Sequence, residues 1–78
     1  MNGDKGTQIQ GPQDPRDGLE AVVALRRLLE TLESAQVENA FLAGWSWARI
    51  AEVLGVSKQA VHKKHAPRLR EKYPGMRP

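Results

Sequence analysis

Hydrophobic residues recur every three or four positions from Val22 to Leu42, and this spacing is typical of an amphipathic helix. The run LEAVVALRRLLETLESAQVENAFLAG is also rich in strong helix formers. It predicts one long helix over residues 18–43, with Asp17 as its N-cap and Gly44 directly after its end.

The stretch WARIAEVLGVSKQAVHKK contains two shorter helical patterns separated by a glycine. Apolar residues at helical spacing predict a helix over residues 46–54, and Gly55 can adopt the positive φ that closes it. A further helix is predicted over residues 58–65. Ser46 and Ser57 stand where these two helices need an N-cap. The pattern therefore indicates two short helices joined by a tight turn.

Two short helices joined in this way have the spacing of a helix-turn-helix. The segment GWSWARIAEVLGVSKQAVHKKH resembles the helix-turn-helix of bacterial DNA-binding regulators and the C-terminal DNA-binding segments of resolvases and sigma factors. The residues that match the family pattern are Ile50, Ala51, Leu54, Gly55, Val56 and Val61. The chain departs from the pattern at Lys64, where an apolar residue is usual, so we expect a loosely packed helix end with the Lys64 stem along the core.

The resemblance implies an all-α fold: a three-helix helix-turn-helix domain with an extended N-terminal helix. We place this domain at residues 18–66. Residues 1–17 are rich in Gly, Pro, Gln and Asp, and we predict a disordered tail there. Pro67 disfavours helical geometry in the residue before it, so the last helix should end near residue 65, with Pro67 able to begin one short further turn. A basic C-terminal tail then covers residues 67–78.

Charge is distributed unevenly along the chain, whose net charge is +3. Residues 1–45 contain four Lys or Arg against seven Asp or Glu, whereas residues 46–78 contain eight against two. The positive charge thus lies on the segment that resembles a DNA-binding motif. This favours nucleic acid over a membrane as the partner.

Polar side chains of the predicted recognition helix lie opposite the inward-facing Val61 on a helical wheel. Gln can pair with adenine, Lys with guanine or phosphate, and His can donate to guanine. The N-terminus of this helix has no carboxylate at its third position and suits a phosphate. The candidate DNA-contacting residues, including basic residues placed for the DNA backbone, are Ser57, Lys58, Gln59, His62, Lys63, Arg49, Arg68 and Arg70. A merely solvated polar face and tail is the alternative.

The N-terminal part of the long helix carries a leucine-rich stripe. A helix of some 25 residues reaches nearly 40 Å, more than a short helix-turn-helix can cover. We therefore predict a homodimer with Val22, Leu25, Leu29 and Leu32 at its interface. The alternative is a break near Ser34 that folds the N-terminal part back onto the domain, although no Gly or Pro marks such a break.

Other chemistry has less support in the sequence. His62 and His65 could both reach a metal, but no Cys, Asp or Glu stands close by to complete a site, so we expect no metal and no cofactor. Trp45 and Trp47 could stack on bases, although their place at a capped helix start favours core packing. The motif supplies no set of nucleophile, base and oxyanion donor, so we do not expect an enzyme.

These patterns together predict a sequence-specific protein that binds double-stranded DNA as a transcriptional regulator, with its recognition helix in the major groove. The alternative is a protein-interaction adaptor whose long helix docks on RNA polymerase or another regulator. The chain has no cysteine, no secretory signal pattern and no apolar run of membrane length. We therefore expect a cytoplasmic, nucleoid-associated protein without membrane contact.

Overall fold

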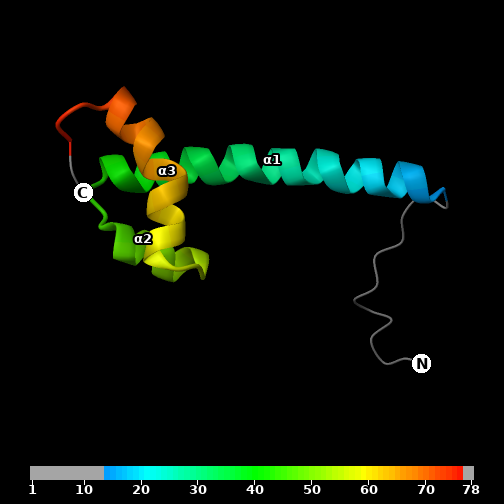
Figure 1. The fold of residues 1–78 in the computed structure, drawn as a ribbon, viewed down its shortest axis with the longest axis horizontal. Helices are drawn as coiled ribbons and strands as arrows, with labels where there is room; N and C mark the ends of the chain where they lie inside the picture. Colours follow the sequence, from blue (N-terminus) through cyan, green and yellow to red (C-terminus); the bar gives the residue numbers. More distant parts are fainter. Residues whose placement is uncertain (1–13, 77–78) are drawn as a thin grey trace.

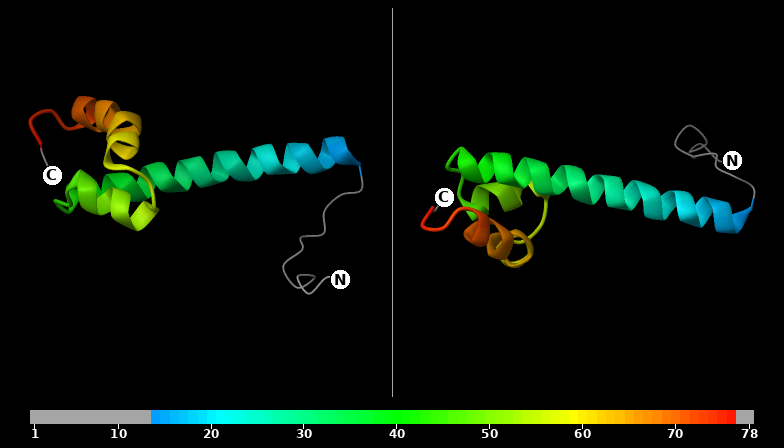
Figure 2. Two further views of the ribbon diagram at one scale, coloured as in Figure 1. Left: turned by 60° about the horizontal axis from the view of Figure 1, so that its bottom comes forward. Right: turned by 90° about the horizontal axis from the view of Figure 1, so that it is seen from above.

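The computed structural model describes residues 14–76 and contains three helices, α1 (Pro15–Leu42), α2 (Trp47–Leu54) and α3 (Lys58–Lys72) (Figure 1). The predicted all-α, three-helix fold is confirmed. We call α2, α3 and the C-terminal third of α1 the head, and residues 15–32 the rod. The rod extends away from the head in every view (Figures 1 and 2), and the whole measures 53 × 26 × 19 Å. The disorder predicted for residues 1–13 lies outside the described residues.

α1 begins at Pro15 and not at the predicted residue 18. Asp14 is its N-cap, because its carboxylate accepts a hydrogen bond of 2.9 Å from the N–H of the second helical residue. Proline fits the first helical position because the N–H of that residue makes no hydrogen bond within the helix, so its absence costs nothing. Asp17 lies in the first turn, where its negative charge interacts favourably with the positive end of the helix dipole. The predicted cap at Asp17 and the predicted tail at residues 14–17 were therefore wrong.

Both connections between helices have the same form, a glycine, an apolar residue and a capping serine. Gly44 and Gly55 have φ values of 85° and 75°, and the residue after each donates to a carbonyl five positions earlier, at 3.0 and 3.1 Å. Ser46 and Ser57 then each accept a hydrogen bond of 3.1 Å from the third N–H of the next helix. The predicted serine caps and the turn at Gly55 are confirmed.

A small core joins the three helices within the head. Its buried apolar residues are Val37, Phe41, Ile50, Ala51, Val61, Ala66 and Leu69. Trp45 and Trp47 are partly buried and pack against this cluster, with the Phe41 and Trp47 ring centroids 5.8 Å apart. Leu54 and Val56, which match the family pattern, are 41 % and 49 % exposed. Both line grooves at the surface of the head and not its centre.

α3 continues through Pro67 to Lys72, so the predicted helix end near residue 65 was wrong, and residues 67–72 of the predicted tail are helical. An internal proline removes one helical hydrogen bond and costs about 3 kcal/mol. Burial of Ala66 and Leu69 on either side of it offsets that cost, since Leu69 is fully buried. Figure 1 shows α3 bending where yellow passes into orange, the region of the proline.

Gly55→Val should lower the thermal unfolding midpoint of the head. A side chain in the left-handed region costs roughly 1 kcal/mol or more. A Cβ at Gly55 would meet nothing within 4 Å, so backbone strain is the only cost we expect. Gly55→Asn is the matched control, because Asn tolerates this conformation and should lose less stability. Circular dichroism melts measure both, and an equal loss for the two variants would contradict this explanation.

Candidate nucleic-acid interface

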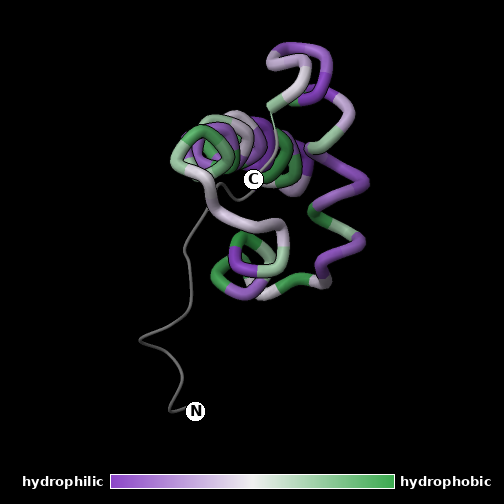
Figure 3. The backbone as a smooth tube through the Cα atoms, turned by 90° about the vertical axis from the view of Figure 1, so that its left-hand side faces the viewer, coloured by the Kyte–Doolittle hydropathy of each residue, from purple (hydrophilic) through white to green (hydrophobic). Residues whose placement is uncertain are grey.

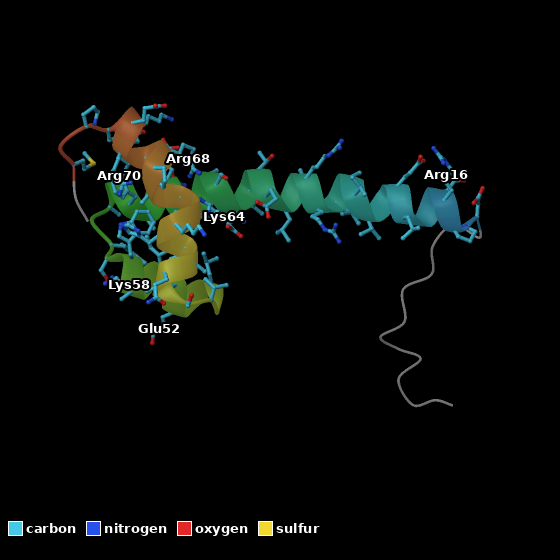
Figure 4. The ribbon with its side chains drawn as sticks, viewed as in Figure 1. Arg16, Glu52, Lys58, Lys64, Arg68 and Arg70 are labelled. Atoms are coloured by element: carbon cyan, nitrogen blue, oxygen red, sulfur yellow. The ribbon has the colours of Figure 1, made fainter. Side chains whose placement is uncertain are left out.

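The inner face of α3 is held against α1 by ion pairs. Lys64 Nζ lies 2.9 Å from Glu30 Oε1 and 3.1 Å from Glu33 Oε2. Lys72 Nζ lies 2.8 Å from Glu38 Oε2. Lys64 therefore reaches across to the carboxylates of α1, and the predicted loose helix end with a lysine stem along the core was wrong. Figure 4 shows Lys64 between α3 and the neighbouring turns of α1.

His65 is the buried polar residue of the head, 1 % exposed. Its Nε2 lies 2.7 Å from Glu33 Oε2, and its Nδ1 lies 3.1 Å from Arg68 Nη1. A guanidinium can only donate, so Nδ1 accepts, and Nε2 donates to the carboxylate of Glu33. Arg68 also donates to the backbone carbonyl of Ser34 at 3.5 Å. This chain of hydrogen bonds fixes α3 on α1.

Two carboxyl groups of α1 are stabilised in their charged form by these contacts. The hydrogen bond from His65, with further help from Lys64, lowers the pKa of Glu33 below its ordinary value of 4.5. Hydrogen bonds from Lys72 and then Tyr73 lower the pKa of Glu38 in the same way. The carboxylate of Glu38 in turn raises the pKa of the Tyr73 hydroxyl.

The outer face of α3 carries the side chains that remain for a partner. Lys58, Gln59, Lys63 and Arg70 are exposed, and none forms a side-chain hydrogen bond or ion pair within residues 14–76. Figure 4 shows Lys58 near the start of α3 and Arg70 near its other end. Figure 3 shows α3 as a largely hydrophilic helix. Gln59, Lys63 and Arg70 share one side of α3, and Lys58 stands at its N-terminal end. We call these four exposed polar side chains the outer face.

The other predicted contact residues have contacts of their own within the head. His62 is exposed, with its ring edge-on to Trp47 at a centroid distance of 5.5 Å. The guanidinium of Arg49 stacks 3.7 Å above the Trp45 ring. Ser57 caps α3. Arg68 is directed to α1, so it stands apart from the exposed residues of the outer face. Arg49 lies on α2, beside a tryptophan that lines the space between α1 and α2.

The contacts between α1 and α3 were missed in the sequence, although a signal for them exists. Lys64, Arg68 and Lys72 recur every fourth residue, which places them on one helical face. Glu30, Glu33 and Glu38 offer carboxylates along α1 at comparable spacing. A last helix that ends near residue 65, as predicted from Pro67, contains only the first of these three basic residues, so their common face appears only in the longer helix.

Both tryptophans and both histidines have contacts within the head that account for their positions. Trp45 and Trp47 pack on the core cluster. The ring nitrogens of His65 are occupied by Glu33 and Arg68, and the ring of His62 lies on Trp47. Among residues 14–76 there is no group of three or more side chains that could hold a metal ion.

No protein-family model, curated protein or solved structure matches the chain. In the part of the chain that the structure describes, no helix has the length and apolar character needed to cross a membrane.

Acid should destabilise the head through Glu33 and Glu38. Their lowered pKa values contribute stability that is present above the ordinary value of 4.5 and is lost as the pH falls through the folded-state values. The double variant Glu33→Gln, Glu38→Gln should be less stable at neutral pH and lose less on acidification. Denaturant titrations measure this, with Glu52→Gln as an exposed control. A double variant with an unchanged pH dependence would contradict the assignment.

Proposed function

We propose that the chain is a sequence-specific DNA-binding protein, a transcriptional regulator, in which α2, the Gly55 turn and α3 act as a helix-turn-helix. One observation carries this proposal: the outer face of α3 is exposed, basic and polar, and its side chains have no partner within residues 14–76. A helix that presents Lys, Gln and Arg outward from a rigid support has the chemistry to enter a major groove.

The charge that supports DNA binding is smaller than the sequence total suggests. Lys64, Arg68 and Lys72 are engaged with α1. Lys58, Lys63 and Arg70 remain on the outer face, and Arg49 is a further exposed cation, on α2. We therefore propose that these four cations contact phosphates of the DNA backbone and that Arg68 does not.

Base readout in this proposal falls to side chains near the start of α3. Gln59 can bond to an adenine edge, and Lys63 can bond to a guanine or to a phosphate. His62 lies at the margin of the face, where its ring could donate to a base while staying against Trp47. The N-terminal amides of α3 beyond Ser57 add a phosphate contact, since its first turn carries no acidic residue.

We further propose that the protein acts as a homodimer through the exposed stripe that contains Val22, Leu25, Leu29 and Leu32. A cytoplasmic, nucleoid-associated location fits this role. We infer no catalytic activity, because the hydroxyl groups of Ser46 and Ser57 serve as caps and the ring of His65 is held between α1 and Arg68.

DNA affinity should fall steeply with salt, and removal of an outer cation should flatten that dependence. A variant that makes one phosphate contact fewer should have a slope of log affinity against log salt that is smaller by about 0.9. Lys58→Ala and Lys63→Ala should each show this change with a random-sequence duplex, as measured by fluorescence anisotropy. Lys72→Ala is the matched control, because its ammonium group is bound to Glu38 and the slope should stay constant.

An adaptor of the transcription machinery predicts a different result in the same experiment. Such a protein would bind duplex DNA weakly, with no salt slope that depends on Lys58 or Lys63. That outcome would contradict the DNA-binding proposal and favour the adaptor.

Gln59→Ala should relax sequence preference without abolishing DNA binding. Loss of a bidentate base contact costs about 1–3 kcal/mol of discrimination at one base pair. Selection from a randomised duplex pool with the wild type and the variant measures the preference at each position. Glu71→Ala, an exposed change on the same helix, should leave the selected sequence intact. Identical selected sequences for the wild type and Gln59→Ala would rule out base readout by Gln59.

A further inference from the structure

The rod carries an apolar stripe that no part of residues 14–76 covers. Leu19, Val22, Leu25, Leu29 and Leu32 keep between 46 and 67 % of their surface exposed. Figure 2 shows the N-terminal part of the rod clear of α2 and α3 in both of its views, while its last turn meets α3 through Glu30 and Lys64. A row of large apolar side chains of this length is typical of a protein interface.

A groove of about 380 Å³ lies at the other end of α1, between α1 and α2. Its lining includes small residues of α1 and its C-cap, Ala40 and Ala43, and two apolar residues of α2, Val53 and Leu54. Val53 is 69 % exposed. The groove is therefore apolar and has room for large side chains from another molecule.

The stripe and the groove belong to one continuous face of α1. Its positions follow the alternating three- and four-residue spacing of a coiled-coil seam, in the order Val22, Leu25, Leu29, Leu32, Gln36, Asn39 and Ala43. The last three line the groove. One end of this face thus projects large apolar side chains, while the other end is hollow and lined by smaller residues.

We propose that two copies pair through α1 in antiparallel orientation, so that the rod of each copy lays Leu19 and Val22 into the groove of the other. The inference rests on the proposed dimer and adds its orientation and the groove as a second binding surface. Leu29 then lies opposite the partner's Leu32, and Val22 lies opposite the partner's Asn39. The exposed amide of Asn39 can turn to the rim of the groove.

The residues that flank the seam fit this orientation. In an antiparallel pair Arg26 faces the partner's Glu33, and Leu28 faces the partner's Ala35. A parallel pair places Leu28 beside the partner's Glu33 and Arg26 beside the partner's Ala21, and it sets groove against groove. Opposite charges and paired large and small side chains therefore favour the antiparallel dimer.

Other occupants fit the face less well. Residues 1–13 of the same chain contain Met1 and Ile9 as their only large apolar residues, which is too few to cover the stripe and the groove. A lipid surface is also a poor match, because residues 15–33 carry three arginines against four carboxylates. Amphipathic helices that lie on anionic membranes are basic on their polar face.

Single cysteines in the full chain test the orientation, because the natural sequence contains none. Val22→Cys and Asn39→Cys proteins, one of them tagged, are oxidised separately and as an equilibrated mixture. We expect a covalent heterodimer from the mixture and no covalent dimer from either protein alone. In the antiparallel register, like positions lie about 25 Å apart at about 1.5 Å per residue, too far for a disulfide.

Cross-linking of Val22→Cys with itself would overturn the orientation in favour of a parallel pair. If the protein is a dimer but the mixture of Val22→Cys and Asn39→Cys proteins gives no cross-link, the proposed register of the two helices is overturned. Sedimentation of the wild type at micromolar concentration tests the pairing itself, and a monomer would overturn it. Leu29→Glu should give a monomer with a folded head, whereas Thr31→Glu, on the opposite side of α1, should stay dimeric. A dimeric Leu29→Glu would place the seam elsewhere.

These results are separable from those that test DNA binding. A monomer with salt-dependent affinity for DNA would overturn the pairing and keep the proposed DNA-binding function. A cross-linked antiparallel dimer without affinity for DNA would overturn that function and keep the pairing.

Discussion

The contact of His65 with Glu33 and Arg68 is the interaction on which the arrangement of the head depends. Only seven apolar residues are buried in the part of the chain that the structure describes, so apolar packing alone stabilises the position of α3 on α1 only weakly. Hydrogen bonds to charged groups contribute roughly 1.5–3 kcal/mol each, and a buried partner left unpaired costs a similar amount. A slide or rotation of α3 would separate the imidazole of His65 from Glu33 and the guanidinium of Arg68 from the carbonyl of Ser34, because both partners lie on α1. The polar contact therefore fixes both the position and the rotation of α3.

That rotation divides the basic residues of α3 into two groups with different roles. Lys64 and Lys72 meet carboxylates of α1 in largely exposed ion pairs, which solvent screens and which stabilise a fold only weakly. Lys58, Lys63 and Arg70 are exposed and make no ion pair with α1, and the proposed affinity for DNA rests on them. The strongly basic C-terminal half of the sequence thus contributes to folding as well as to the proposed binding of DNA. Its total charge overstates the number of phosphate contacts that the helix can make.

Local sequence rules succeeded where a short segment decides its own conformation and failed where distant residues decide it. The serine caps and the Gly55 turn follow from backbone groups within a few residues, so they could be predicted. Pro67 was expected to end the last helix because the rule for proline is also local. Burial of Leu69 against the head outweighs that rule, and the helix continues to Lys72. The start of α1 could have been predicted from the sequence as well, because Asp14 and Pro15 form a recognisable signal for a helix N-terminus.

The sequence by itself determined three helices, their two tight turns and the apolar stripe of the rod. Helical periodicity and capping depend on residues that are close together in the sequence. The sequence also placed most of the candidate DNA-contacting residues on the second short helix and directly beside it. Only the tertiary structure decided which cations remain free, because that depends on how α3 is turned against Glu30, Glu33 and Glu38. It likewise revealed the groove beside Val53, since a hollow between two helices has no signature in either helix alone.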